Sequence, residues 1–217
     1  QMCIRDRMKT YDVIIIGAGT SGLTARREVA KKTDNYLLVQ DGPLGTTCAR
    51  VGCMPSKVLI QVANDYYQSQ KISKKNLVHF ENGLPNLKNI MTHVRSLRDR
   101  FVKGVLSGMS EWEDCFKEGR ASFIDQQTIE VQGEKLKAKK FIIATGSRPF
   151  VPDPWVPYKP FFLDTDAFFE QKDFSGRLLV VGLGVIGLEL GQALARLGVD
   201  VVAVSYTHLR AHETSGY

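Results

Sequence analysis

Two cysteines five positions apart, Cys48 and Cys53, are the residues of this sequence best suited to chemistry. They lie in a run from Gly45 to Lys57 whose letters are GTTCARVGCMPSK. Pro55 suits the first turn of a helix, where a missing N–H costs little. N–H groups at a helix start and the charge of Lys57 both favour a thiolate at Cys53. The pair is therefore predicted to be a redox-active dithiol.

Two other interpretations of the cysteine pair remain open. A structural disulfide needs the two Cα atoms within about 4.4–6.8 Å, which requires a bent backbone between them. A zinc site needs two or more further Cys or His ligands at nearby spacing. His79 and His93 do not supply that spacing, so no metal is expected. Cys115 stands near Trp112 and Phe116 and is expected to pack rather than to react.

A glycine turn precedes the cysteine pair. Gly17, Gly19 and Gly22 follow the apolar run 11–16 and precede a helical pattern over 23–32, which is the setting of a dinucleotide-binding turn. The first glycine makes the tight turn, the second lets the backbone approach a pyrophosphate, and the third allows close helix packing. The phosphates are expected at the N-terminus of the helix.

The ribose-binding residue of such a site is expected at the end of the second strand, predicted over 36–39. Gln40 stands there, and Asp41 is the alternative if the strand ends one residue later. A glutamine can bind a ribose hydroxyl, but without the help of a charge.

A second glycine turn lies much later in the chain. Gly182, Gly184 and Gly187 follow a predicted strand over 178–181 and precede a helix over 188–197 and a strand over 199–204. Other predicted elements are a helix from Pro55, a long amphipathic helix, and short strands in the middle of the chain. The long helix is expected over 86–111 and the short strands over 121–124, 128–131 and 141–144.

These motifs, in this order, resemble the N-terminal part of the pyridine nucleotide–disulfide oxidoreductase family, and within it dihydrolipoyl dehydrogenases most. The matching segments are residues 16–19, 45–57, 144–149 and 181–189. The resemblance implies an α/β fold, with a Rossmann-like FAD-binding domain and the first βαβ unit of a truncated NAD(P)-binding domain. It implies a domain over 8–150 that holds FAD and the redox disulfide, a crossing segment over 151–176, and the start of the NAD(P) domain over 177–204.

The resemblance also implies roles for individual residues. Cys53 would face the flavin, Cys48 would exchange with a substrate disulfide, and Lys57 would lie by the flavin ring. Glu189 would lie on the nicotinamide side of the NAD(P) held by the second glycine turn. Besides the first glycine turn and the Gln40 position, FAD would be lined by Thr47, Ala121, Ala144, Thr145 and Gly146.

The sequence departs from the family pattern in two places that matter. The family usually has an acid at the position of Gln40, and often Gly-Gly before Thr-Cys where this chain has Gly45-Thr46. The family's central and dimer-interface domains and its C-terminal His–Glu pair are not present in these 217 residues, and none of His79, His93, His208 and His212 is assigned that role.

The implied function is electron transfer between NAD(P)H, FAD, the cysteine pair and a substrate dithiol or disulfide. Dihydrolipoamide is the leading candidate for this substrate. A glutathione-type or mercuric reductase is the alternative within the family, and an inactive FAD-binding fragment is the alternative for this chain as it stands. The full-length protein is expected to be a homodimer with a small-molecule or lipoyl-type substrate.

Composition and charge bear on three further questions: nucleic-acid binding, membrane insertion and location. The net charge is +6, with 43% hydrophobic and 24% charged residues, as in a globular protein. The lysine-rich run 135–140 is interpreted as a solvated hairpin edge rather than a nucleic-acid surface, since no recognition motif accompanies it. No apolar run is long enough to span a membrane. A cytoplasmic location is the expectation.

The two ends of the chain are predicted to be foreign to it. The segment 205–209 can be encoded by the reverse complement of codons that encode part of residues 1–6, as expected of adaptor sequence. Residues 1–7 and 205–217 are therefore set aside from functional reasoning.

Overall fold

The computed structural model describes residues 9–78, 83 and 85–205. It is an α/β structure, as the sequence predicts, in which the chain divides into two compact units. One unit takes its described residues from Gln1–Arg50 and Arg100–Pro160, and the other from Val51–Asp99 and Phe161–Tyr217. The domain limits given above stay predictions.

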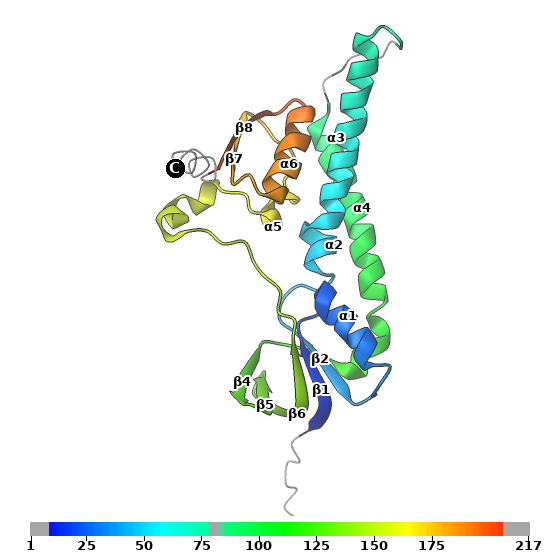
Figure 1. The fold of residues 1–217 in the computed structure, drawn as a ribbon, viewed down its shortest axis with the longest axis vertical. Helices are drawn as coiled ribbons and strands as arrows, with labels where there is room; N and C mark the ends of the chain where they lie inside the picture. Colours follow the sequence, from blue (N-terminus) through cyan, green and yellow to red (C-terminus); the bar gives the residue numbers. More distant parts are fainter. Residues whose placement is uncertain (1–8, 79–82, 84, 206–217) are drawn as a thin grey trace, which may run out of the picture. The chain divides into compact units, whose positions relative to one another are not determined.

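The first unit is built on a six-stranded sheet with the order β3-β2-β1-β6-β5-β4; Figure 1 labels these strands except β3. The neighbours β3, β2, β1 and β6 run parallel, while β6, β5 and β4 form an antiparallel meander. The carboxyl ends of β2, β1 and β6 therefore meet at one edge, where Rossmann-type sheets bind nucleotides. The strands are β1 (Thr10–Ile16), β2 (Tyr36–Gln40), β3 (Phe116–Glu118), β4 (Ala121–Asp125), β5 (Thr128–Val131) and β6 (Glu134–Ile143).

The lysine-rich run is not at a sheet edge, so that part of the interpretation was wrong. It lies in β6, which pairs with β5 through its first half and with β1 through the rest. Lys135 and Lys137 are exposed while Leu136 and Ala138 are buried, as expected of a strand with one face toward the core. The hairpin itself is present, because Gln132 and Gly133 both adopt positive φ angles, the signature of a two-residue turn.

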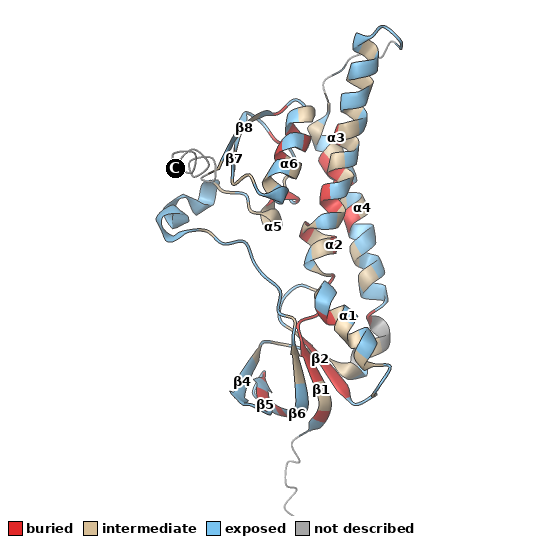
Figure 2. Cartoon of the chain, viewed as in Figure 1, coloured by how far each residue is buried: buried red, intermediate tan, exposed pale blue. Residues whose placement is uncertain are grey.

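Buried residues predominate in β1 and β2, on both faces of each strand (Figure 2). Ile14 and Val39 pack on one face with Leu136 of β6. Ile15 and Leu38 pack on the other face, next to Met109. This explains why the sequence of β1 and β2 is continuously apolar instead of alternating.

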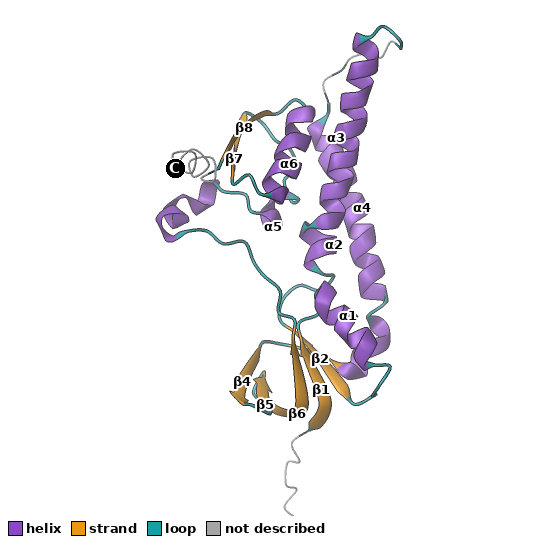
Figure 3. Cartoon of the chain, viewed as in Figure 1, coloured by secondary structure: helices purple, strands orange, loops and turns teal. Residues whose placement is uncertain are grey.

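Helix bounds differ from the predicted ones at several ends. Helix α1 (Thr20–Val29) begins within the glycine turn, directly after Gly19 and three residues before the predicted start. Helix α4 (Leu87–Ser107) ends four residues early, and the chain continues as a 3-10 segment, η1 (Ser110–Cys115). Apolar periodicity predicted the helical faces correctly but did not fix where each helix ends. Figure 3 shows the resulting distribution of helices and strands.

The second unit contains a two-stranded parallel sheet, β7 (Arg177–Val181) and β8 (Asp200–Val204), joined by α6 (Val185–Arg196). Helix α3 (Cys53–Lys74) packs with α6 and the first part of α4 around Leu59, Met91 and Phe169, and this core also includes residues around α5 (Thr165–Phe168). The proline-rich segment contains the 3-10 segment η2 (Asp153–Phe161).

A buried charged side chain stabilises the packing of the second unit. Arg98 of α4 is buried and donates hydrogen bonds to Asp99 and Glu170. Burial lowers the pKa of the guanidinium, but the two carboxylates outweigh it and raise the pKa overall. Arg98 therefore stays charged and holds the segment after α5 against α4.

Within the part of the chain that the structure describes, no helix has the length and apolar character needed to cross a membrane.

Candidate functional site

The first glycine turn is a tight structure in which two of the three glycines cannot carry a side chain. Gly17 has φ +109°, and a Cβ there would lie 2.1 Å from the carbonyl oxygen of Ala144. A Cβ on Gly22 would lie 1.7 Å from the carbonyl oxygen of Gly17. Real Cβ atoms essentially never come within 3.0 Å of a heavy atom outside their own and the adjacent residues. The turn therefore allows α1 to pack directly against the end of β1.

Gly19 differs from the other two because a Cβ there would meet nothing within 4 Å. It is the N-cap residue of α1, whose first turn has no side-chain cap and no acidic residue. The backbone N–H groups at this helix start thus face an open space with a positive local potential. These features fit the pyrophosphate of a dinucleotide such as FAD.

Gln40 ends β2, so the strand does not extend to Asp41. Its Oε1 accepts a hydrogen bond of 2.6 Å from the backbone N–H of Ala18, inside the glycine turn. Its Nε2 donates to the carbonyl oxygen of Asp41 at 2.8 Å. The side chain thereby ties the end of β2 to the turn, and its role as a ribose contact stays a prediction.

The segment Ala144–Gly146 lies beside the same turn. The N–H of Ala144 donates to the carbonyl oxygen of Ile16 at 2.8 Å, and its carbonyl oxygen lies against Gly17. Gly146 has φ +72°, which favours glycine. The structure therefore brings together three of the predicted FAD-binding segments, at the ends of β1, β2 and β6.

The remaining predicted FAD contacts are Thr47 and Ala121. Thr47 is exposed and is the first residue of α2 (Thr47–Val51). Ala121 begins β4 and packs against the core cluster that contains Ile14 and Leu136. Their assignment to FAD stays a prediction.

Thr46, one of the departures from the family pattern, adopts a backbone conformation that favours glycine. Its φ is +61°, which is unusual for a β-branched residue. Its Oγ1 accepts a hydrogen bond of 3.1 Å from the N–H of Ala49, which caps the start of α2. The cap offsets part of the cost of the left-handed backbone.

The two cysteines of the predicted dithiol stand on consecutive helices. Cys48 is half-buried in α2, and Cys53 is exposed as the first residue of α3, with Gly52 as its N-cap. The prediction of a helix start at this point is therefore confirmed. No disulfide joins the described cysteines Cys48, Cys53 and Cys115 to one another.

Lys57, one turn after Cys53, pairs with Glu189 of α6. Their Nζ and Oε1 atoms are 2.8 Å apart, and the side chains are 62% and 35% exposed. Two residues that the sequence assigned separately, 132 positions apart, thus form one ion pair. No pattern of the sequence indicated this pairing.

The second glycine turn resembles the first, although a Cβ on its first glycine, Gly182, would meet nothing within 4 Å. Gly182 has φ +101°, and a Cβ on Gly187 would lie 2.0 Å from the carbonyl oxygen of Gly182. A Cβ on Gly184 would meet nothing within 4 Å, and this residue is the N-cap of α6. The first turn of α6 has no acidic residue. The turn fits the pyrophosphate of a second dinucleotide such as NAD(P).

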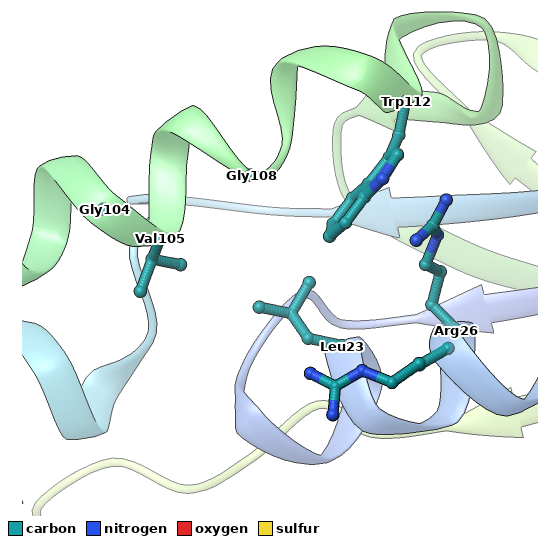
Figure 4. Close-up of a pocket in the computed structure, with 7 residues that line it drawn as sticks. Leu23, Arg26, Gly104, Val105, Gly108 and Trp112 are labelled. Carbon is teal, nitrogen blue, oxygen red and sulfur yellow. The ribbon is translucent and has the colours of Figure 1, made fainter.

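A cavity of about 280 Å³ in the first unit includes none of the predicted site residues. Leu23 and Val105 point into it, and the guanidinium of Arg26 stacks on the ring of Trp112 at 3.8 Å from its centroid (Figure 4). Arg26 also donates to the hydroxyl of Tyr36 at 2.8 Å. Arg26 thus stabilises the packing of α1 instead of facing the glycine turn.

In the described part of the chain, no group of three or more His, Cys, Asp or Glu side chains is arranged to hold a metal ion. His93 is exposed on α4, while His79, His208 and His212 lie outside the described residues. Residues 1–7, and all of 205–217 except Ser205, also lie outside them.

Residues 11–212 match the family described as pyridine nucleotide-disulphide oxidoreductase. The chain belongs to this family. The family is FAD-dependent, with NAD(P)H as the electron donor, so the two cofactors expected from the sequence are those of its family. The resemblance drawn from the cysteine and glycine motifs is thereby confirmed.

Curated relatives of two kinds are similar to the chain. Dihydrolipoyl dehydrogenase of Schizosaccharomyces pombe is 34% identical over 212 residues, which cover 90% of this chain and 40% of the relative. Mercuric reductase of Lysinibacillus sphaericus is 31% identical over 198 residues, which cover 88% of this chain and 35% of the relative. The chain thus spans less than half the length of these relatives.

A solved structure supports the fold. The HOCl-induced flavoprotein disulfide reductase RclA from Escherichia coli superimposes with a TM-score of 0.72 at 22% sequence identity, over 89% of this chain and 41% of that protein. At this identity the likeness establishes the Rossmann-like fold and nothing finer.

Proposed function

We propose that the full-length protein passes electrons between NAD(P)H, FAD and the Cys48–Cys53 pair, and from there to or from a substrate dithiol or disulfide. The observation that carries the proposal is the ion pair between Lys57 and Glu189. It joins the helix that begins with Cys53 to the helix that begins at the second glycine turn. Cys53 of the proposed dithiol and Glu189 of the proposed nicotinamide site are thus carried by two helices, α3 and α6, that are in contact within one unit.

Bound FAD would supply a two-electron relay between the nicotinamide and the cysteine pair. The first glycine turn would hold its pyrophosphate at the start of α1. Gly19 would allow close approach, while Gly17 and Gly22 keep the helix against the sheet. The second turn would hold NAD(P) in the same way at the start of α6.

The cysteines would carry out the exchange with substrate. The Cys48 thiolate attacks one sulfur of a substrate disulfide, and the other sulfur leaves and takes a proton. The Cys53 thiolate then attacks Cys48, the second substrate thiol leaves with a proton, and the Cys48–Cys53 disulfide forms. Two electrons pass from the pair to the substrate, and oxidation of a dithiol is the reverse sequence. The place of Cys53 at the start of α3, one turn before Lys57, supports its part in this assignment.

Dihydrolipoamide is the proposed substrate, supported by the similarity to dihydrolipoyl dehydrogenases. Mercuric reductases are about as similar, so reduction of a mercuric ion is the second candidate. A homodimeric assembly in the cytoplasm is proposed with the same function.

The test is anaerobic titration of the full-length protein with NADH or NADPH, followed by its absorbance. Two-electron reduction is expected to give a long-wavelength thiolate-to-flavin band. Cys53→Ser is expected to abolish the band and Cys48→Ser to leave it attainable. Cys115→Ser is the control and should behave as the unaltered protein. Flavin spectra that neither Cys48→Ser nor Cys53→Ser alters would overturn the assignment.

The substrate is tested on the same full-length protein. Turnover of NADH with lipoamide supports the first candidate, and NADPH oxidation that depends on mercuric ion supports the second. An intact long-wavelength band without turnover of lipoamide would contradict the proposed substrate while leaving the dithiol assignment in place.

A further inference from the structure

The first dinucleotide site has no carboxylate at the end of β2. Gln40 occupies that position, and its amide oxygen already accepts a hydrogen bond from Ala18. Its amide nitrogen donates to Asp41. A neutral oxygen that is already engaged is a weak acceptor for a ribose hydroxyl, because charged acceptors form roughly twice as strong a bond.

A carboxylate stands next to this position on the neighbouring strand. Glu118 ends β3 and is the register partner of Gln40 in the parallel pair β2–β3. The N–H of Gly119 donates to the carbonyl oxygen of Gln40 at 2.8 Å, so the two strand ends are held together. Paired residues of adjacent strands project to the same face, and the strands lie about 4.8 Å apart. The glutamate thus shares the sheet edge and the face of Gln40.

The carboxylate of Glu118 is available to a ligand. It is exposed, and among the described residues it takes part in no ion pair or side-chain hydrogen bond. The neighbouring acid Glu134, by contrast, is engaged by Lys117 at 2.6 Å. Asp41 is also exposed, but successive residues of an extended chain alternate between faces. Asp41 is therefore less suited than Glu118 to act on the face of Gln40.

We propose that Glu118 supplies the carboxylate that accepts a hydrogen bond from the 2′-hydroxyl of the adenosine ribose of FAD. Gln40 then acts as a positioning residue that holds the glycine turn through Ala18. The proposal rests on the proposed function only in taking FAD as the ligand of the first glycine turn. It assigns to β3, a strand of three residues, a role that the family places at the end of β2.

The experiment measures the Kd of FAD for the full-length protein, after removal of bound flavin, by quenching of flavin fluorescence. Glu118→Gln is expected to weaken FAD binding about tenfold, because a charged hydrogen bond becomes a neutral one. Glu130→Gln, the same change at an exposed position of β5, is the matched control and should leave the Kd unchanged. Asp41→Asn should also leave it unchanged. The double variant Gln40→Glu with Glu118→Gln should recover most of the lost affinity.

The 2′-deoxyadenosine analogue of FAD shows whether the loss concerns the ribose. The unaltered chain should bind it more weakly than FAD, and Glu118→Gln should cause no further loss. An unchanged Kd of FAD in Glu118→Gln, a loss in Asp41→Asn instead, or an equal loss for FAD and the analogue overturns the role of Glu118 alone. Failure of the unaltered full-length protein to bind FAD overturns the ligand itself, and with it the proposed function.

Discussion

Alanine substitutions in the first glycine turn are expected to have different effects, because the space around each glycine differs. A Cβ on Gly22 would stand 1.7 Å from the Gly17 carbonyl oxygen, half of the 3.4 Å at which ordinary contact begins. A Cβ on Gly19 would meet nothing, and the φ of −74° there suits any residue. Gly22→Ala is therefore expected to disturb the fold, and Gly19→Ala only the binding of the pyrophosphate.

The magnitude for Gly22→Ala follows from two opposing effects. Alanine in place of glycine inside a helix contributes about 1 kcal/mol of stability. Overpacking against backbone costs about 1–3 kcal/mol and more when the neighbour cannot move. The neighbour is a backbone carbonyl and not the end of a flexible side chain, so it cannot move aside at low cost. The upper part of the range therefore applies, and a net loss of about 2 kcal/mol is expected, equal to a fall of roughly 4–8 °C in Tm for a chain of this size.

The assay combines thermal unfolding without ligand and titration with FAD. Gly22→Ala should lower the Tm. Gly19→Ala should keep the Tm within about 2 °C, since surface changes are worth about 0.5 kcal/mol, but should weaken FAD binding. Gly187→Ala and Gly184→Ala repeat the comparison in the second turn. A Cβ on Gly187 would lie 2.0 Å from the carbonyl oxygen of Gly182, and a Cβ on Gly184 would meet nothing within 4 Å. Equal Tm values for the two variants of one turn, or normal FAD binding by Gly19→Ala, would refute the reasoning.

Two further predictions concern stability. Hydrogen bonds from Lys139 and Thr33 lower the pKa of Asp12 in the folded protein. The ionised carboxylate therefore stabilises the fold fully at a pH above its unfolded pKa of about 3.9. The stabilisation is lost as the pH falls through the lower pKa of the folded state. Asp12→Asn should therefore lose less stability than the unaltered chain between pH 7 and pH 3 in urea unfolding, and a loss equal to that of the unaltered chain contradicts the assignment. Thr46→Asn should raise stability by about 0.5–1 kcal/mol, because asparagine tolerates a positive φ and retains the helix cap; a lower urea midpoint than that of the unaltered chain would show that the strain at Thr46 is not real.

The helices and strands around both glycine turns could be predicted because their signals are local. Apolar runs, glycines at fixed spacing and a proline at a helix start each constrain a few neighbouring residues. β3 was missed because a three-residue strand has no periodicity of its own and forms only by pairing with β2. The end of α4 was misplaced because apolar residues continue past the point where the helix becomes a 3-10 segment.

The candidate site was predicted as a set of residues rather than as an arrangement. The sequence indicated which residues belong to the two glycine turns and to the cysteine pair. It did not indicate that Gln40 would bind Ala18, or that Lys57 would pair with Glu189. Each of these contacts joins segments that lie far apart along the chain, and no local pattern encodes the partner.

The sequence by itself therefore determined the family, the two dinucleotide-type turns and the position of the cysteines, because steric demands on glycine and the periodicity of apolar residues act within a few positions. Only the tertiary structure decided that β6 lies between β1 and β5, that the carbonyl of Ala144 packs against Gly17, and that Glu118 is the register partner of Gln40. Strand order and register depend on which long-range pairing buries the most apolar surface and satisfies the most backbone hydrogen bonds. That choice is made by the whole unit at once.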